Sequence, residues 1–140
     1  MGEAENAEVI RRYFDGCQSG DLEVLLSTLA PDVLHYFIDR PSVSGAEHLA
    51  RYWRKMKRVT DPIWTVDHII VRGDEVVSEW SVVQTPPGTQ RRVLNRGSEW
   101  YVMREGRIAE VRAYFRWDDQ ANSELVGFPY RERGYFTSPR

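Results

Sequence analysis

The first part of the chain carries apolar residues at helical spacing. Val9, Tyr13 and Cys17 follow one another at intervals of four, which places them on one side of an amphipathic helix. We expect this helix to end near Ser19-Gly20, because glycine readily adopts the left-handed conformation that closes many helices. Asp21 then precedes a second apolar run and is a suitable N-terminal cap for a short second helix.

A short strand and a third helix are predicted next. Val33 to Ile38 is rich in aromatic and branched residues, as strands are. Ser44-Gly45-Ala46-Glu47 has the spacing of a capping box, in which the serine and glutamate side chains bond each other's backbone amides. The following helix repeats apolar residues at helical spacing, and its expected inward side is Leu49, Tyr52, Trp53 and Met56.

From residue 61 onward the pattern changes to strands. Short turns rich in glycine or proline separate four long segments: Pro62 to Arg72, Glu75 to Thr85, Gln90 to Met103 and Arg107 to Trp117. Short turns join antiparallel neighbours, so these strands are expected to form a meander. Helices followed by strands indicate an α+β fold rather than alternating βαβ units. Residues 118–140 are aromatic enough that we expect them to fold back on the domain or on a partner subunit.

Composition and charge exclude several classes of protein. The 140 residues suit one domain, residues 1–140, and a net charge of −2 offers no basic surface for nucleic acid. No apolar run approaches the roughly 20 residues of a membrane-spanning helix, and the acidic N-terminus is unlike a secretory signal. Cys17 is the single cysteine, so neither an internal disulfide nor a cysteine zinc site is possible. We therefore expect a cytoplasmic protein without metal, cofactor, nucleic-acid or membrane partner.

The aromatic content is the one unusual feature of the composition. Five Trp, seven Tyr and five Phe are enough to line a pocket for a small hydrophobic molecule. The candidate wall residues are Trp53, Trp64, Trp80, Trp100 and Phe115, although core packing explains such residues equally well. Trp80 and Trp100 lie on neighbouring predicted strands and share a face if the strand register permits.

Three stretches of the chain resemble nuclear transport factor two-like proteins, a superfamily that includes ketosteroid isomerases and SnoaL-like polyketide cyclases. They are Arg12 to Asp32, with its Gly20-Asp21-Leu22 and Leu29-Ala30-Pro31-Asp32 motifs, Ser44-Gly45 with the following helix, and Glu105 to Phe115. The resemblance covers about residues 5–117. It implies a cone-shaped, curved antiparallel sheet wrapped around the N-terminal helices, a cystatin-like α+β barrel, and a homodimer formed through the outer sheet face. It does not imply one reaction, because this scaffold serves isomerases, cyclases, dehydratases, hydrolases and binding proteins.

The resemblance can be followed to single catalytic positions. Tyr13 matches the tyrosine that holds the substrate oxyanion in the isomerases. The isomerase's catalytic aspartate falls at Phe37, so that base is missing, and Asp39 replaces it only with a change in loop length. The second acid of the isomerases falls at Ser98, beside Glu99. One of three catalytic groups is retained, so steroid-type isomerisation by the same groups is not implied.

Other candidate groups come from the strands. Alternation sends His35, Phe37 and Asp39 toward the expected pocket. His35 suits a general acid or base, because imidazole titrates near neutral pH, and the hydroxyl of Tyr13 suits a developing carbonyl oxyanion. Both residues are equally consistent with core packing.

Several polar residues of the later strands leave alternatives open. Of Asp67 and His68, only one can face inward. The charged residues Glu79, Glu99 and Arg112 are expected to form a ladder across neighbouring strands.

These observations favour a cofactor-free acid–base enzyme of cyclase, isomerase or dehydratase type acting on a small hydrophobic carbonyl or polyketide-like substrate. Its predicted catalytic residues are Tyr13, His35 and Asp39. Its predicted substrate contacts are Phe37, Trp53, Trp64, Trp80, Ser98, Trp100 and Phe115. Two alternatives remain: a non-catalytic small-molecule-binding or dimerisation domain, and an epoxide or ester hydrolase whose water is activated by Asp39 or Asp67.

Overall fold

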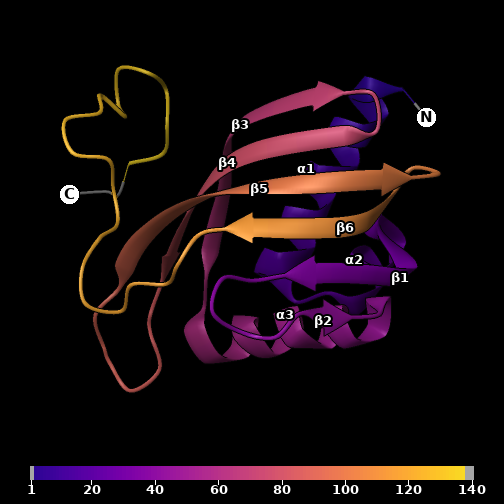
Figure 1. Ribbon diagram of the computed structural model, residues 1–140. Coiled ribbons are helices and arrows are strands. Elements are labelled where there is room, and N and C mark those ends of the chain that lie inside the picture. The colour runs from indigo at the N-terminus through magenta and orange to yellow at the C-terminus, as the bar shows by residue number, and fades with distance from the viewer. Residues whose placement is uncertain (1, 138–140) are drawn as a thin grey trace.

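Helices cover one face of a curved sheet in this computed structural model, which describes residues 2–137 (Figure 1). The helices are α1 (Glu3–Ser19), α2 (Leu22–Thr28) and α3 (Ala46–Thr60). The strands are β1 (Leu29–Tyr36), β2 (Val43–Ser44), β3 (Ile63–Arg72), β4 (Glu75–Gln84), β5 (Val93–Arg104) and β6 (Arg107–Tyr114). The sheet has the order β2-β1-β6-β5-β4-β3 and does not close into a barrel. The expected α+β class and curved sheet around N-terminal helices are confirmed.

The ends of the first helices follow the sequence signals. Gly20 adopts a left-handed conformation (φ 72°), and its amide bonds the Gly16 carbonyl at 2.8 Å. The Asp21 carboxylate accepts hydrogen bonds from the amides of Glu23 and Val24, as an N-cap should. The predicted capping box of α3 is wrong, because Gly45 with φ 93° takes the cap position and no side chain caps this helix. In the described part of the chain, no helix has the length and apolarity needed to cross a bilayer.

The strands confirm the antiparallel meander of β3, β4, β5 and β6. β1 begins at Leu29 rather than Val33 and pairs with β6 in parallel, a contact between residues far apart in the sequence. Local patterning cannot reveal such a partner, because it reports which face of a strand is apolar and not which strand lies beside it.

The inward face of the sheet depends on a close contact between β4 and β5. Trp80 lies opposite Gly97, and a Cβ atom at Gly97 would lie 2.6 Å from Cζ2 of the indole. Glycine therefore lets the Trp80 ring lie against β5. Against this face pack the buried side chains of α1 and α3, among them Ile10 and Leu49. Each fully buried side chain of this kind stabilises the fold by about 1.5–3 kcal/mol.

The chain after β6 folds back on the chain's own sheet, beside the bent ends of β4 and β5 and away from the helices (Figure 1). We call residues 118–136 the C-terminal segment. The amide of Asp118 bonds Asn95 Oδ1 at 2.9 Å, and the amide of Ser123 bonds the Leu94 carbonyl at 3.0 Å. Near its end, the Phe136 amide donates to Asp67 Oδ1 at 2.7 Å. Residues 138–140, the end of the predicted extension, lie outside the described residues.

Candidate functional site

A buried row of polar side chains crosses the interior of the curved sheet. His35 Nε2 lies 3.4 Å from Glu99 Oε2, with side-chain exposures of 1% and 6%. Tyr101 donates a hydrogen bond to Glu99 Oε1 at 3.2 Å, and its hydroxyl lies 2.8 Å from that of Ser78. Glu99 and Tyr101 are two residues apart on β5 and so share its inward face. Ser78, Tyr101, Glu99 and His35 thus form one continuous polar row.

The register explains how a carboxylate of β5 reaches a histidine of β1, although β6 lies between these strands. Glu99 of β5 pairs with Ala113 of β6. His35 of β1 pairs with Val111, which is two residues from Ala113 on the same face of β6. The small side chain of Ala113 leaves room for Glu99 to reach across it. A carboxylate beside an imidazole orients the ring and stabilises its protonated form.

Tyr13 and Trp53 make a second polar contact from the helices. Trp53 Nε1 donates to the Tyr13 hydroxyl oxygen at 2.7 Å, so this contact does not use the hydroxyl proton of Tyr13. The Trp53 ring lies edge-on to His35, with ring centroids 5.9 Å apart. Burial raises the pKa of Tyr13 well above its usual value near 10. Burial, and then the Glu99 charge, raises the pKa of Tyr101 in the same way, so both phenols are donors at neutral pH.

The lone thiol lies in the same interior. Cys17 is buried, and this burial raises its pKa well above the usual value for cysteine. A buried, protonated thiol is a weak nucleophile, so Cys17 is part of the packing of α1.

Aromatic rings form the rest of the interior wall. Trp64 lies 4.9 Å from Trp80, Trp80 lies 4.6 Å from Phe115, and Phe115 lies 4.5 Å from Trp117, measured between ring centroids. Trp53 joins this cluster through Trp64, at 5.8 Å. The predicted wall residues Trp53, Trp64, Trp80 and Phe115 therefore pack together.

Several buried nitrogens of this interior have no hydrogen-bond partner among residues 2–137. They are Nε1 of Trp64, Nε1 of Trp80 and both ring nitrogens of His35, because the 3.4 Å approach of Nε2 to Glu99 is an ion-pair contact and not a hydrogen bond. Such unpaired buried groups cost about 1–3 kcal/mol each, and oxygen atoms of a ligand would satisfy the two indole donors.

A hollow of about 270 Å³ opens at one end of the interior. Its lining residues are Phe37, Ile38, Asp39, Arg40, Phe115, Arg116 and Trp117. Phe37 also stacks on the His35 ring, with centroids 4.2 Å apart, and the Arg40 guanidinium lies 4.6 Å from the same Phe37 ring. Phe37 thus contacts both the hollow and the His35 ring.

The structure places Asp39 at the rim of this hollow rather than in the interior. β1 ends at Tyr36, so strand alternation does not continue to Asp39, which has a left-handed backbone (φ 63°). Its carboxylate pairs with Arg116 at 2.6 Å, and both side chains are largely exposed. The prediction of Asp39 as an interior catalytic group is therefore wrong.

Ser98 and Trp100 are also on the other side of the sheet from the interior. Because Glu99 faces inward, its neighbours on both sides face outward. Ser98 pairs with the outward Glu79, while Trp100 bonds Glu75 at 3.0 Å and is partly exposed. The predictions that these two residues contact an interior ligand are wrong. The register also does not meet the condition for a shared face of Trp80 and Trp100, which lie on opposite faces of the sheet. The predicted charge ladder of Glu79, Glu99 and Arg112 is also wrong in one member, because Glu99 faces the interior.

Asp67 and His68 both face outward, against the expectation that they point to opposite sides. The pairing of β3 with β4 shifts between Val66 and His68, and this bulge places an extra residue on one side of the strand. Neither Asp39 nor Asp67 reaches the interior, so the hydrolase hypothesis loses both carboxylates that it named.

Sequence reasoning missed the inward roles of Glu99, Tyr101 and Ser78. The resemblance aligned the second acid with Ser98, one position away, and a shift of one residue reverses the face of a strand. The alternation of Glu99, Tyr101 and Met103, all buried, carries the signal that identifies the inward side of β5. In the described residues, no three His, Cys, Asp or Glu side chains lie close enough together to hold a metal ion.

Comparison with known proteins identifies the family. The model of the SnoaL-like domain matches residues 10–111, most of the chain. This chain belongs to the SnoaL-like domain family. The C-terminal segment lies beyond the matched residues.

Solved structures agree with this fold. A protein of unknown function with a cystatin-like fold from Methylobium petroleophilum is 28% identical, with a TM-score of 0.69, covering 100% of this chain and 97% of that one. A putative polyketide cyclase from Xanthomonas campestris is 19% identical, with a TM-score of 0.73, covering 81% and 92%. An LEH-like epoxide hydrolase from M. tuberculosis is 19% identical, with a TM-score of 0.72, covering 81% and 84%. No curated protein matches the sequence.

Proposed function

We propose that this protein is a cofactor-free acid–base enzyme of cyclase, isomerase or dehydratase type that acts on a small hydrophobic carbonyl compound. These reactions share a step in which a proton leaves a carbon beside a carbonyl group while negative charge develops on the oxygen. The step needs a base, a hydrogen-bond donor and an enclosed apolar site. Membership of the SnoaL-like family supports a role of this general type.

The buried pair of His35 and Glu99 carries the proposal. In the proposed step, His35 accepts the substrate proton at its unpartnered Nδ1, and the electrons of the broken C–H bond move to the carbonyl oxygen. Glu99, 3.4 Å from Nε2, stabilises the imidazolium that results. Glu99 acts through His35 and is a positioning residue, held in turn by Tyr101.

Tyr13 is the proposed oxyanion donor. Its oxygen accepts the Trp53 bond, and its own proton is donated to the developing enolate. His35 then returns the proton to a different carbon in an isomerisation, or to a departing hydroxide in a dehydration. The aromatic wall excludes water and strengthens both polar contacts.

Ligand binding tests the site before any substrate is known. Tryptophan fluorescence is titrated with fused-ring phenols and ketones, in a Trp100→Phe background that removes the indole of the outer face. We expect Tyr13→Phe and His35→Ala to weaken binding about tenfold, or about 1.4 kcal/mol. His48→Ala is the matched control, because His48 is an exposed histidine of α3. Binding that is unchanged in both interior variants would contradict the proposal.

One observation favours a second function, a non-catalytic binding domain. His35, Tyr13 and Glu99 are each at most 5% exposed, as core residues are. A binding domain would hold its ligand in the same interior without any proton transfer. Saturable binding together with no proton exchange on any carbonyl ligand would favour this second function.

We also propose that the protein forms a homodimer through the outer sheet face. Tyr36, Arg112, Trp100, Val77 and Ile70 are successive cross-strand partners from β1 to β3, so they form one row. Three of them, Tyr36, Trp100 and Ile70, are large exposed side chains. Three large exposed apolar side chains in one row, with Arg112 between Tyr36 and Trp100, favour association of this sheet face with a second copy.

A further inference from the structure

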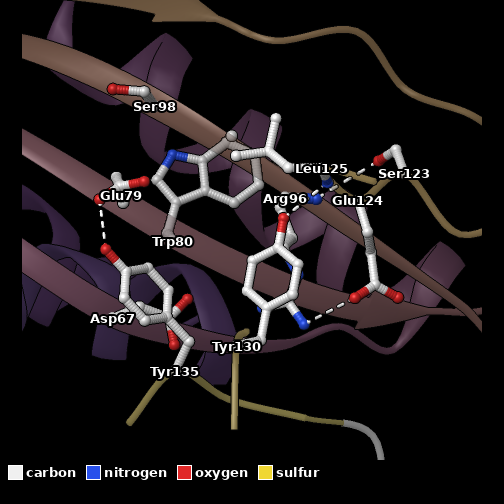
Figure 2. A pocket seen from close by; sticks show the side chains of 11 residues that line it. Asp67, Glu79, Trp80, Arg96, Ser98, Ser123, Glu124, Leu125, Tyr130 and Tyr135 are labelled. Atoms are coloured by element: carbon white, nitrogen blue, oxygen red, sulfur yellow. Dashed lines mark hydrogen bonds and ion pairs between the residues drawn. The ribbon is translucent and has the colours of Figure 1, made fainter. Parts of the chain in front are cut away.

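A second cavity lies between β3–β5 and the C-terminal segment (Figure 2). Glu79 and Ser98, which line it, are on the outward face of the sheet, opposite to that of Glu99 and His35. The volume of the cavity is about 370 Å³, within the range of about 300–1,000 Å³ typical of small-molecule sites. Asp67, Glu79 and Arg96 line it from the strands, and Glu124, Tyr130 and Tyr135 from the segment. The strand residues of the lining lie within the residues matched by the family model, whereas the wall formed by the segment lies outside them.

Arg96, the cationic residue of this cavity, already has charged and aromatic partners. Its Nη2 lies 3.1 Å from Glu124 Oε2, and its Nη1 lies 2.7 Å from Ser81 Oγ. Its guanidinium carbon lies 3.7 Å from the centre of the Tyr130 ring. Figure 2 shows Glu124 reaching Arg96 from the segment. Arg96 thus forms its ion pair with Glu124, and it forms none with Asp67 or Glu79, the other two carboxylates of the cavity.

Asp67 and Glu79 are bound mainly by neutral donors. Asp67 accepts from the Phe136 amide at 2.7 Å and from the Ser81 hydroxyl. Glu79 accepts from the Tyr135 hydroxyl at 2.5 Å, and this contact raises the pKa of Tyr135 to about 12. Among the described residues, the basic side chain in contact with Glu79 is His68, whose Nδ1 lies 3.4 Å from Glu79 Oε1. Three carboxylates against one guanidinium leave the lining negative at neutral pH.

One buried donor in the lining has no partner. Nε of Arg96 makes no hydrogen bond within residues 2–137, although the Arg96 side chain is only 9% exposed. A buried N–H of this kind favours a ligand that brings an acceptor oxygen. The rings of Tyr130 and Tyr135 add apolar surface for the body of that ligand.

We propose that this cavity binds a small aromatic amine whose ammonium group is held by Asp67 and Glu79, whose ring packs on the tyrosines, and whose oxygen accepts a bond from Arg96. The carboxylates supply the charge that selects a cation over a neutral molecule of the same shape. The cavity shares Trp80 with the interior wall, but its proposed polar contacts are not those of the acid–base site, so the proposal does not depend on the function proposed there.

Calorimetric titration of the full chain with three matched probes tests this assignment. Tyramine carries the ammonium, tyrosol replaces it by a hydroxyl, and 3-(4-hydroxyphenyl)propionate replaces it by a carboxylate. We expect tyramine to bind at least tenfold more tightly than tyrosol and more tightly still than the propionate, with an affinity that falls as salt is added.

Two variants locate the binding. Glu79→Gln and Asp67→Asn should each weaken tyramine binding about tenfold and leave tyrosol binding unchanged, which also shows that the cavity is intact. Glu47→Gln, which removes an exposed carboxylate of α3, should bind all three probes as the wild type does. Tyramine that binds no better than tyrosol, or equally well to all variants, would overturn the proposal. Tighter binding of the propionate, or no binding by any probe, would overturn it as well.

Discussion

The contact between Gly97 and Trp80 makes Gly97→Ala the most informative single substitution in the fold. The new methyl group would lie 2.6 Å from Cζ2 of Trp80 and 2.7 Å from Cβ of Phe115. Carbon atoms pack best about 3.5–4.0 Å apart, so the overlap is about 1 Å with both neighbours. The indole has little freedom to retreat, because Trp64 and Phe115 lie 4.9 and 4.6 Å from it on their ring centroids.

Two opposing effects set the size of the change. Overfilling a packed core costs about 1–3 kcal/mol. Replacing glycine by alanine restricts the unfolded chain and returns about 0.4–1 kcal/mol, since the backbone at Gly97 is not in the left-handed region. We therefore expect Gly97→Ala to lower the free energy of unfolding by about 1–2 kcal/mol, or the Tm by about 2–8 °C.

Urea unfolding followed by tryptophan fluorescence and circular dichroism measures this change. The control is a double-mutant cycle with Trp80→Phe, because phenylalanine lacks the indole atoms Cζ2 and Cη2 that meet the new methyl group. The loss in the double variant should be smaller than the sum of the single losses by about 1 kcal/mol. Additive losses, or a Gly97→Ala variant as stable as the wild type, would refute the packing argument.

Three further predictions follow from burial and exposure. Tyr13 and Tyr101 have raised pKa values in the folded state, so the stability that they contribute is complete below pH 10. Above pH 10 the free energy of unfolding should fall by up to about 1.4 kcal/mol per pH unit for each tyrosine. Urea unfolding between pH 9 and 11 measures this slope, and Tyr101→Phe should make it smaller. Asp39→Asn should change stability by less than about 1 kcal/mol, because the ion pair with Arg116 is exposed and asparagine tolerates the left-handed backbone; a larger loss in urea unfolding would mean that the pair has a structural role. Trp100→Glu should shift the protein to monomer in sedimentation experiments, whereas an unchanged oligomeric state would exclude the sheet row as the interface.

The elements whose signals are local could be predicted from the sequence. Gly20 and Asp21 mark a helix end and a helix start through groups within three residues of them. The predicted capping box is wrong although Ser44 and Glu47 are the residue types that such a box requires. Gly45, with φ 93°, is the N-cap of α3, and no side chain caps the helix. A motif names residues that can bond each other, while the backbone conformation decides whether they do.

The candidate site was predicted only in part, because it depends on register and pairing. His35 and Tyr13 were found from residue chemistry and from the resemblance. Glu99 was not, since its contact with His35 requires the parallel pairing of β1 with β6 and the small Ala113 between them. Regular alternation predicted that one of Asp67 and His68 faces inward without saying which. The bulge beside Asp67 turns both side chains outward.

Exchange of carbon-bound protons tests the central claim most directly, because it reports the first step common to the proposed reactions. Wild-type protein is incubated in D₂O with simple cyclic ketones, such as 2-tetralone and 2-indanone, and deuterium incorporation beside the carbonyl is followed by NMR. The account predicts exchange well above the rate without protein, a loss of about 10²-fold or more in His35→Gln, and a smaller loss in Glu99→Gln. Exchange that is no faster than background for every ketone, or equally fast in His35→Gln, would contradict an acid–base site at His35.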